Sequence, residues 1–300
     1  MMKKLLLTGA AGFLGRNIIP DLKKNYSVKT LGRSANNDVR CDLSESIPDF
    51  TESYDIVLHA AGKAHIVPKT EEERETFYKV NLEGTKNLCA GLERVGVPNS
   101  FVFISTVAVY GLDTGEDISE EAELKGNTPY ALSKILAEQY LADWCLANGV
   151  KLSILRLPLV AGVNPPGNLG AMIKGIKSGR YLSIGKADAR KSVVMAVEVA
   201  RLLPVLEDTA GVYNISDGYD PSFGELEMLI ARQQGRRKPL AIPYWMAKLM
   251  AKCGDVIGRR APINSYKLGK IVNPLTFSSK KAQAELNWIP LRVLENFKIS

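Results

Sequence analysis

A short apolar strand that runs directly into a glycine-rich turn is the feature that most constrains this fold. Leu5-Leu6-Leu7 has the length of a buried parallel strand, and glycines at positions 9, 12 and 15 follow it immediately. Gly9 permits a tight turn, Gly12 lets a phosphate approach the backbone, and Gly15 lets the next helix pack close to the strand. The pattern therefore predicts a strand, a turn and a helix whose N-terminus faces a phosphate group.

The rest of the chain alternates strand-like and helix-like segments, which is typical of βαβ units in a parallel sheet. The strands we expect are Lys4–Thr8, Val28–Leu31, Asp55–His59, Phe101–Ser105 and Leu152–Arg156, and the helices are Leu14–Lys24, Thr70–Ala90 and Pro129–Ala147. Prolines at positions 158, 165 and 166 interrupt this alternation. We predict an α/β fold in which residues 1–160, joined by 189–217, form a Rossmann-type doubly wound parallel sheet. Residues 161–188 and 218–300 are predicted to form a smaller, C-terminal lobe.

Tyr130 and Lys134 are four residues apart in the third of these helices, so their side chains share one face. A cation within about 4–6 Å lowers the pKa of a phenol, ordinarily ~10, by roughly 1–3 units. The pair therefore fits an acid–base group that works near neutral pH. The same spacing also fits an aromatic residue and a lysine on an ordinary surface helix.

Composition indicates a single large core and no metal or disulfide framework. The chain has 300 residues, of which 46% are hydrophobic, and no apolar stretch long enough to span a membrane or to act as a signal peptide. We therefore expect a cytoplasmic protein. The cysteines at 41, 89, 145 and 253 fit neither a disulfide framework nor a zinc knuckle. For the two histidines, His59 and His65, we expect structural or loop roles and no metal binding.

Together these motifs resemble the extended short-chain dehydrogenase/reductase family, in its branch of nucleotide-sugar epimerases, dehydratases and reductases. The resemblance runs through nearly the whole chain, from Thr8-Gly9-Ala10-Ala11-Gly12 to the closing segment 278–290, where Asn287 replaces the family's glycine. It implies an enzyme that uses NADP or NAD, acts on a nucleotide-activated sugar and forms a homodimer.

The resemblance also implies the residues of a site. Thr106 would align the C4 oxygen of the sugar, Tyr130 would transfer a proton, and Lys134 would lower the pKa of Tyr130 and hold the nicotinamide ribose. The implied cofactor-binding residues are Gly9, Gly12, Phe13, Leu14, Gly15, Arg33, Asp42, Leu43, Ala60, Ala61, Gly62, Asn81, Ser105, Tyr130, Lys134 and Pro158. The implied substrate-binding residues are Thr106, Asn168 and the basic pair Arg190 and Lys191, either of which could hold the diphosphate.

Departures from the family narrow the chemistry. Sugar 4,6-dehydratases carry an acid and a base directly after the catalytic threonine, where this chain has Val107 and Ala108. Hydride transfer at C4 remains, as in 4-ketoreductases and 4-epimerases. We favour a 4-ketoreductase of surface-polysaccharide pathways, because Pro158-Leu159 replaces the epimerases' Phe-Asn. The alternative is an epimerase of UDP-glucose or UDP-N-acetylglucosamine.

The cofactor choice depends on the end of the second strand, which reads Leu31-Gly32-Arg33-Ser34. An acidic residue that would bind the ribose 2′-hydroxyl of NAD is missing there, and Arg33 could meet the 2′-phosphate of NADP. NADP is therefore slightly favoured over NAD.

The last third of the chain is basic. Residues 201–300 contain 15 Lys and Arg against 9 Asp and Glu, which is 6 of the net charge of +7. This charge suits an anionic partner such as a sugar diphosphate. A non-catalytic nucleotide- or nucleic-acid-binding module is the alternative, but Arg236-Arg237-Lys238 and Arg259-Arg260 lack interleaved aromatic residues, so we expect no nucleic acid. The amphipathic, basic segment 244–252 could graze a membrane. We expect it instead to pack onto the lobe, without stable membrane insertion.

Overall fold

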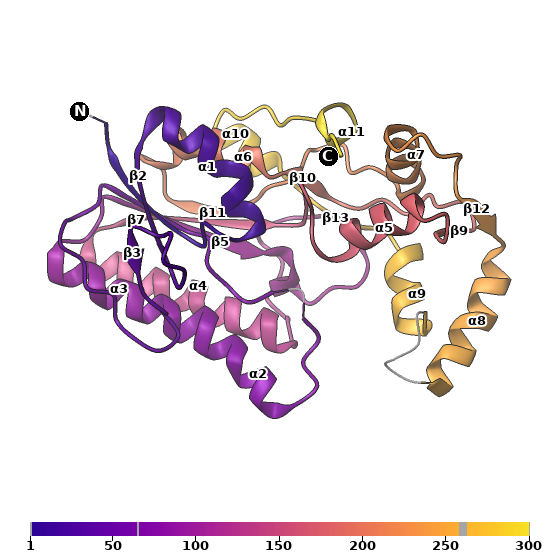
Figure 1. Cartoon of the computed structure of the whole chain (residues 1–300), viewed down its shortest axis with the longest axis horizontal. Helices are drawn as coiled ribbons and strands as arrows, with labels where there is room; N and C mark the ends of the chain where they lie inside the picture. The colour runs from indigo at the N-terminus through magenta and orange to yellow at the C-terminus, as the bar shows by residue number, and fades with distance from the viewer. Residues whose placement is uncertain (1, 65, 258–262, 300) are drawn as a thin grey trace.

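The computed structural model describes residues 2–64, 66–257 and 263–299, and it centres on a seven-stranded parallel sheet (Figure 1). The strand order is β11-β7-β5-β4-β1-β2-β3. These strands are β1 (Lys4–Thr8), β2 (Ser27–Gly32), β3 (Val39–Arg40), β4 (Ile56–His59), β5 (Ser100–Thr106), β7 (Lys151–Leu157) and β11 (Gly211–Asn214). The order reverses direction at β1, as in doubly wound folds, and the predicted α/β, Rossmann-type fold is confirmed.

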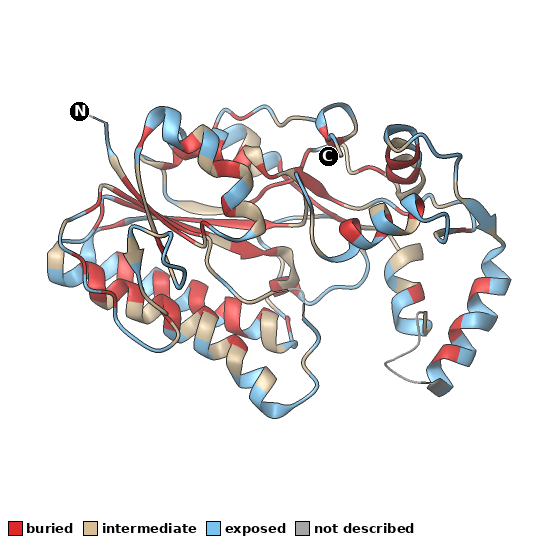
Figure 2. Ribbon diagram, viewed as in Figure 1, coloured by how far each residue is buried: buried red, intermediate tan, exposed pale blue. Residues whose placement is uncertain are grey.

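Helices cover both faces of the sheet (Figure 1). One face carries α1 (Phe13–Asn25) and α6 (Val197–Leu206), and the other carries α2 (Glu71–Tyr78), α3 (Gly84–Val95) and α4 (Pro129–Asn148). Successive residues of β1 serve both layers, since Leu5 and Leu7 pack with α1 and α6 whereas Leu6 packs with α3 and α4. This explains why the central strands β1, β4 and β5 are buried in Figure 2 and why β1 reads as a continuous apolar run.

The predicted helix Thr70–Ala90 is interrupted. Thr70 caps α2 by accepting a hydrogen bond from the amide of Glu73, and a π-helical turn, η1 (Lys79–Glu83), then separates α2 from α3. Such turns widen the helix by one residue and are frequent at functional sites. Asn81 lies inside this turn. Hydrophobic periodicity did not reveal the interruption.

Smaller elements, most of them after β7 in the chain, lie at one end of the sheet (Figure 1). They include three two-stranded pairs: β8 (Leu159–Ala161) with β10 (Val193–Met195), β9 (Leu182–Ile184) with β12 (Leu240–Ile242), and β6 (Gly115–Ile118) with β13 (Leu275–Phe277). The helices are α5 (Gly167–Lys177), α7 (Phe223–Gln233), α8 (Tyr244–Ile257), α9 (Ser265–Val272), α10 (Lys280–Glu285) and α11 (Val293–Asn296), with a 3₁₀ turn, η2 (Val107–Tyr110), after β5.

The chain passes between these two parts more than once. Residues 211–214 return to the large sheet as β11, and Ala282, Leu286 and Trp288 pack in the core that α1 and α6 share. The C-terminal part of the chain therefore packs against the large parallel sheet and its helices as well as against the smaller elements. The division of the chain into two domains at the boundaries given above stays a prediction.

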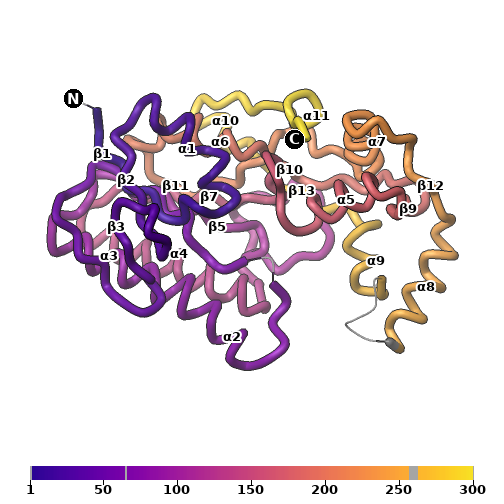
Figure 3. Tube along the Cα trace, viewed as in Figure 1, coloured from indigo at the N-terminus to yellow at the C-terminus, as the bar shows by residue number. Residues whose placement is uncertain are grey.

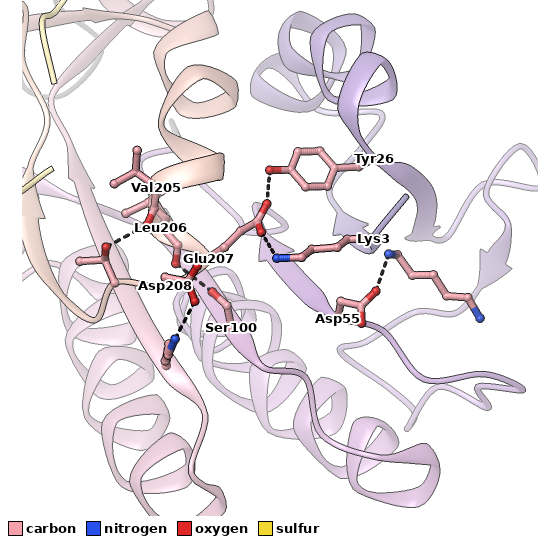
Figure 4. Close-up of polar contacts among 11 residues, drawn as sticks. Lys3, Tyr26, Asp55, Ser100, Val205, Leu206, Glu207 and Asp208 are labelled. Carbon is pink, nitrogen blue, oxygen red and sulfur yellow. Dashed lines mark hydrogen bonds and ion pairs between the residues drawn. The ribbon is translucent and has the colours of Figure 1, made fainter. Parts of the chain in front are cut away.

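At the edge of the sheet where the strands begin, polar contacts join the strands and α1 to the end of α6 (Figure 4). Glu207, just after α6, accepts hydrogen bonds from Lys3 and from the hydroxyl of Tyr26, and Ser100 donates to the carbonyl of Leu206 at 3.0 Å. Burial, with the Glu207 carboxylate as a further cause, raises the pKa of Tyr26. A cavity of about 350 Å³ lies at this edge, and the charges of Lys3, Lys151, Glu207 and Asp208 in its wall are paired with one another.

A buried ion pair joins α4 to β7. Arg156 donates from Nη2 to Oε2 of Glu138 at 2.7 Å, and the hydroxyl of Ser105 donates to Oε1 of the same carboxylate. Arg156 also donates from Nη1 to the hydroxyl of Tyr110 at 3.1 Å, and Tyr110 donates to Asn214 at 2.7 Å. The Glu138 carboxylate therefore links α4 to β5 and β7, and Arg156 and Tyr110 extend this buried network to η2 and β11.

Replacing Glu138 by Gln should lower the free energy of unfolding by about 3–5 kcal/mol, because Arg156 would stay buried without its counter-charge. Urea denaturation followed by circular dichroism measures this loss. Glu83→Gln is the matched control, since the Glu83–Lys86 pair lies on the surface and should contribute only ~0–1 kcal/mol. Equal losses in the two variants would contradict this role for the buried pair.

Candidate active site

The glycine turn closes tightly against the end of β4. Gly9 has a φ of +76°, and a Cβ there would lie 2.7 Å from the backbone of Ala60 and Ala61. A Cβ at Gly15 would lie 2.4 Å from the carbonyl oxygen of Gly9, so α1 can approach the turn only without a side chain. Gly12 is the N-cap of α1 and offers no side-chain cap, which leaves the amides of the first helical turn, at Phe13 and Leu14, available for a phosphate.

His59 connects the ends of β1 and β4 to α3 through a chain of hydrogen bonds. The hydroxyl of Thr85 donates to the carbonyl of Asn81 at 2.7 Å, so it accepts from Nε2 of His59 at 2.9 Å. Nδ1 of His59 then accepts from the hydroxyl of Thr8 at 2.6 Å, which in turn accepts from the amide of Ala61 at 3.0 Å. Burial, with the charge of Lys134 as a second cause, lowers the pKa of His59 to about 3. His59 is thus a neutral structural residue, and His65 lies outside the described residues.

Asn81 holds the loop after β4 against α4. Its Oδ1 accepts from the amide of Lys63 at 2.7 Å, and its Nδ2 donates to the carbonyl of Lys63 and to the hydroxyl of Ser133 at 2.9 Å. A Cβ at Gly62 would lie 3.1 Å from Oδ1 of Asn81 and 3.3 Å from Nζ of Lys134. Asn81, Gly62 and Lys134 therefore meet at one place beside the glycine turn.

Lys134 is buried, and its ammonium group is directed toward β5. Nζ donates to the carbonyl of Ile104 at 2.9 Å and lies 4.4 Å from the centre of the Phe103 ring. Burial lowers the pKa of Lys134 to about 8, although the carboxylate of Glu138 raises it. At neutral pH the amine is therefore still mainly protonated.

Tyr130 is the second residue of α4, one turn before Lys134. Burial raises the pKa of Tyr130 above its ordinary value, and hydrogen bonding to Thr106 lowers it by less. The predicted lowering of this pKa by Lys134 is therefore wrong for the described structure. The reason is that the Lys134 ammonium contacts Ile104 and Phe103 of β5, while the Tyr130 ring lies 6.2 Å from the ring of Phe77.

The structure brings together Thr106, Tyr130, Lys134, Asn81 and the residues after β4. Ser105 differs, since its hydroxyl donates to buried Glu138 and supports the site from within the core. Pro158 directly follows β7.

The expected adenosine contacts lie beyond the ends of β2 and β3. Arg33 is exposed, with Nη1 3.9 Å from Oδ2 of Asp42, and Asp42 accepts from the hydroxyl of Ser44 at 2.7 Å. The carbonyl of Leu43 accepts from Asn87 at 2.8 Å, which fixes this loop to α3. The exposed guanidinium of Arg33 can therefore turn toward a ligand, with the half-buried carboxylate of Asp42 near it.

The two candidate cations of the lobe have different surroundings. Nη1 of Arg190 donates to the carbonyls of Tyr219 and Asp220 at 3.1 and 2.9 Å, and the guanidinium stacks on the Tyr219 ring. Lys191 is half-buried against the ring of Phe223, and burial, with the charge of Lys270 as a second cause, lowers its pKa to about 8. Arg190 thus supports a loop, whereas Lys191 and Lys270 form a basic pair suited to an anion.

Lys270, which pairs with Asp113 at 3.5 Å, was missed in the sequence because only the tertiary fold places α9 beside Lys191. Asn168 is exposed in the first turn of α5. A cavity of about 170 Å³ lies between the loop that precedes Lys191 and helices α8 and α9. Its wall consists of Ile184, Gly185, Lys186, Ala187, Asp188, Ala189, Tyr244, Ile271 and Val272.

The buried neutral state of His59 predicts a pH dependence. The pKa is about 3 in the folded chain and 6.5 for an ordinary histidine, so the unfolded chain takes up a proton first as the pH falls. The free energy of unfolding should therefore decrease between about pH 6.5 and pH 3–4, and less steeply in His59→Asn than in the unsubstituted chain. Urea denaturation at several pH values measures both slopes. Parallel profiles would contradict this assignment.

The chain matches known proteins over most of its length. A sequence model of the NAD dependent epimerase/dehydratase family matches residues 5–216. The chain is 28% identical to a UDP-glucose 4-epimerase of Vibrio cholerae over 99% of its length and 94% of the relative's, and 28% identical to a GDP-6-deoxy-D-mannose reductase of Pseudomonas aeruginosa over 77% and 80%. The solved structure of RMD from Pseudomonas aeruginosa complexed with NADPH superposes with a TM-score of 0.73, at 23% identity, over 98% of this chain and 96% of that one. The matched family model, together with the assembled glycine turn and Thr-Tyr-Lys group, shows that this chain belongs to the NAD dependent epimerase/dehydratase family of nicotinamide-dependent nucleotide-sugar enzymes.

Proposed function

We propose that the protein is a 4-ketoreductase that uses NADPH to reduce the C4 carbonyl of a UDP- or dTDP-linked sugar for surface polysaccharides. The observation that carries this proposal is the group of Thr106, Tyr130 and Lys134 at the carboxyl end of β5. Tyr130 and Lys134 lie one turn apart on α4, and Nζ of Lys134 donates to the carbonyl of Ile104, two residues before Thr106. Val107 and Ala108 follow Thr106, so the site lacks the acid and base that dehydration would need at these places. Hydride transfer with proton transfer at C4 is the chemistry that these residues support.

The residues fit a nicotinamide dinucleotide. The pyrophosphate would lie on the uncapped N-terminus of α1, where Gly9 and Gly15 keep the turn closed and Gly12 leaves space above the backbone. Asn81 and Lys134 would hold the nicotinamide ribose. When bound, the reduced cofactor supplies a hydride to C4.

Tyr130 supplies the proton in this mechanism. Its raised pKa keeps the phenol protonated at neutral pH, which is the state that a proton donor needs. Thr106 hydrogen-bonds the phenol and would also align the C4 oxygen of the substrate. The phenolate that remains then takes up a proton from solvent.

For the substrate's diphosphate we propose Lys191 and Lys270 rather than Arg190, because the Arg190 guanidinium is engaged by two backbone carbonyls. The 170 Å³ cavity beside them would accept the nucleotide base. For the cofactor we propose NADPH, since exposed Arg33 follows β2 where NAD would call for an acidic residue.

A UDP-sugar 4-epimerase is the second candidate. The 28% identity to a UDP-glucose 4-epimerase over 99% of the chain favours it. An epimerase oxidises C4, lets the keto sugar present its other face and returns the same hydride. It therefore needs no reduced cofactor from solution, and this difference separates the two candidates.

Tyr130→Phe should reduce kcat by about a hundredfold or more and leave nucleotide-sugar affinity nearly unchanged, because only the proton-transferring hydroxyl is removed. Steady-state kinetics and calorimetric binding measure the two effects. Tyr140→Phe, on the same helix, is the control and should keep near-normal activity. Activity of Tyr130→Phe within tenfold of the unsubstituted enzyme would refute the assignment.

The reductase and the epimerase predict different fates for deuterium. We expect one equivalent of labelled NADPH to be consumed per UDP-linked 4-keto-6-deoxy sugar, with deuterium retained at C4 of the product. UDP-glucose and UDP-N-acetylglucosamine, incubated without added cofactor, should stay unchanged. Mass spectrometry and NMR follow both reactions. Conversion of the second pair into their C4 epimers, without cofactor consumption in the first reaction, would show that the protein is an epimerase.

A further inference from the structure

Helix α8 presents its large apolar side chains to solvent and its small ones to the protein. Ala247, Ala251 and Gly254 are buried on the face that packs against α9. Trp245, Leu249 and Val256 lie on the opposite face, with exposed fractions of 66%, 59% and 90%. In Figures 1 and 2 the helix lies at the periphery of the molecule, and most of its surface is exposed. The sequence-based expectation that this segment packs onto the lobe holds only for the face that carries Ala247, Ala251 and Gly254.

The spacing makes the exposed residues one continuous stripe. Residues separated by four and by eleven positions lie on the same side of an α-helix, which aligns Trp245, Leu249 and Val256. Lys248 and Lys252 follow Trp245 and Leu249 by three positions and flank the stripe along one side. An apolar stripe with a tryptophan and a lysine border is the pattern of a helix that lies in a membrane interface.

The charge of the residues around α8 also favours a membrane surface as the binding partner. Residues 228–257 contain six Lys and Arg against one acidic residue, Asp255, whose carboxylate accepts hydrogen bonds from Ser265. Arg236, Arg237 and Lys238 are exposed just before β12, which leads into α8. A second copy of this chain would bring the same positive charges against each other, which disfavours self-association through this face. An anionic bilayer offers both an apolar layer for the stripe and negative headgroups for the lysines.

We propose that α8 is a peripheral membrane-binding element that docks on anionic phospholipid through Trp245, Leu249 and Val256, with Lys248 and Lys252 at the headgroups. Docking is interfacial: within the described ranges, no helix is long and apolar enough to cross a bilayer. Tyr244 begins α8 and also lines the 170 Å³ cavity of the lobe, so docking places that cavity near the membrane surface. The inference rests on the surface of α8 and does not depend on the proposed reaction.

Vesicle flotation of the whole protein at about 150 mM salt tests the proposal, with vesicles of equal phosphatidylglycerol and phosphatidylcholine compared with phosphatidylcholine alone. We expect binding to the anionic vesicles only. Tryptophan emission should shift to shorter wavelength on binding, and the shift reports on Trp245 because Trp144 and Trp288 are buried. The double variants Trp245→Ala/Leu249→Ala and Lys248→Glu/Lys252→Glu should each weaken partitioning by about tenfold or more.

Ile289→Ala and Lys23→Glu are the matched controls, since each changes an exposed residue away from α8 and should leave vesicle binding unchanged. Thermal unfolding verifies that every variant is folded. Absence of binding, equal binding to uncharged vesicles, or binding that survives both double variants would overturn the proposal. A lipid-free change of oligomeric size in Trp245→Ala/Leu249→Ala would overturn it too, and would identify the face as a protein interface.

Discussion

The buried ion pair between Glu138 and Arg156 joins helix α4, which carries Tyr130 and Lys134, to the centre of the sheet. Glu138 lies one turn beyond Lys134 and also accepts a hydrogen bond from Ser105, the residue before Thr106. The position of the Thr-Tyr-Lys group relative to the sheet therefore depends on this carboxylate. Its charge also opposes the effect of burial on Lys134 and helps that amine to stay protonated.

Burial acts in opposite directions on the two central groups of the candidate site. It raises the pKa of Tyr130 and lowers that of Lys134, and both changes disfavour the charged form. The phenol therefore rests in its protonated form, ready to donate, whereas the stabilising charge on Lys134 is kept by its contacts with Ile104, Phe103 and Glu138. In the reduction proposed above, the phenol first loses a proton, so its protonated resting form is the one that this reaction needs.

The lobe shows how similar residues take different roles. Arg190 and Lys191 are adjacent in sequence, yet Arg190 stacks on Tyr219 and bonds to the backbone, while Lys191 lies over the ring of Phe223 and its pKa is lowered by burial and by the charge of Lys270. Helix α8 shows the same separation of roles on its two faces, since alanines pack against α9 and the bulky residues stay outside. Part of the basic character of the last third of the chain lies around α8, at Arg236, Arg237, Lys238, Lys248 and Lys252.

The sequence by itself determined the strand, glycine turn and helix at the N-terminus and the shared face of Tyr130 and Lys134, because these depend on local geometry and on spacing along one helix. It also determined the doubly wound fold, since alternating apolar runs leave few other arrangements for a buried parallel sheet. The π-helical turn at Asn81, the raised pKa of Tyr130 and the pairing of Lys191 with Lys270 were decided only by tertiary structure. Each depends on burial or on contact between residues far apart in the chain, and neither quantity is encoded in a local pattern.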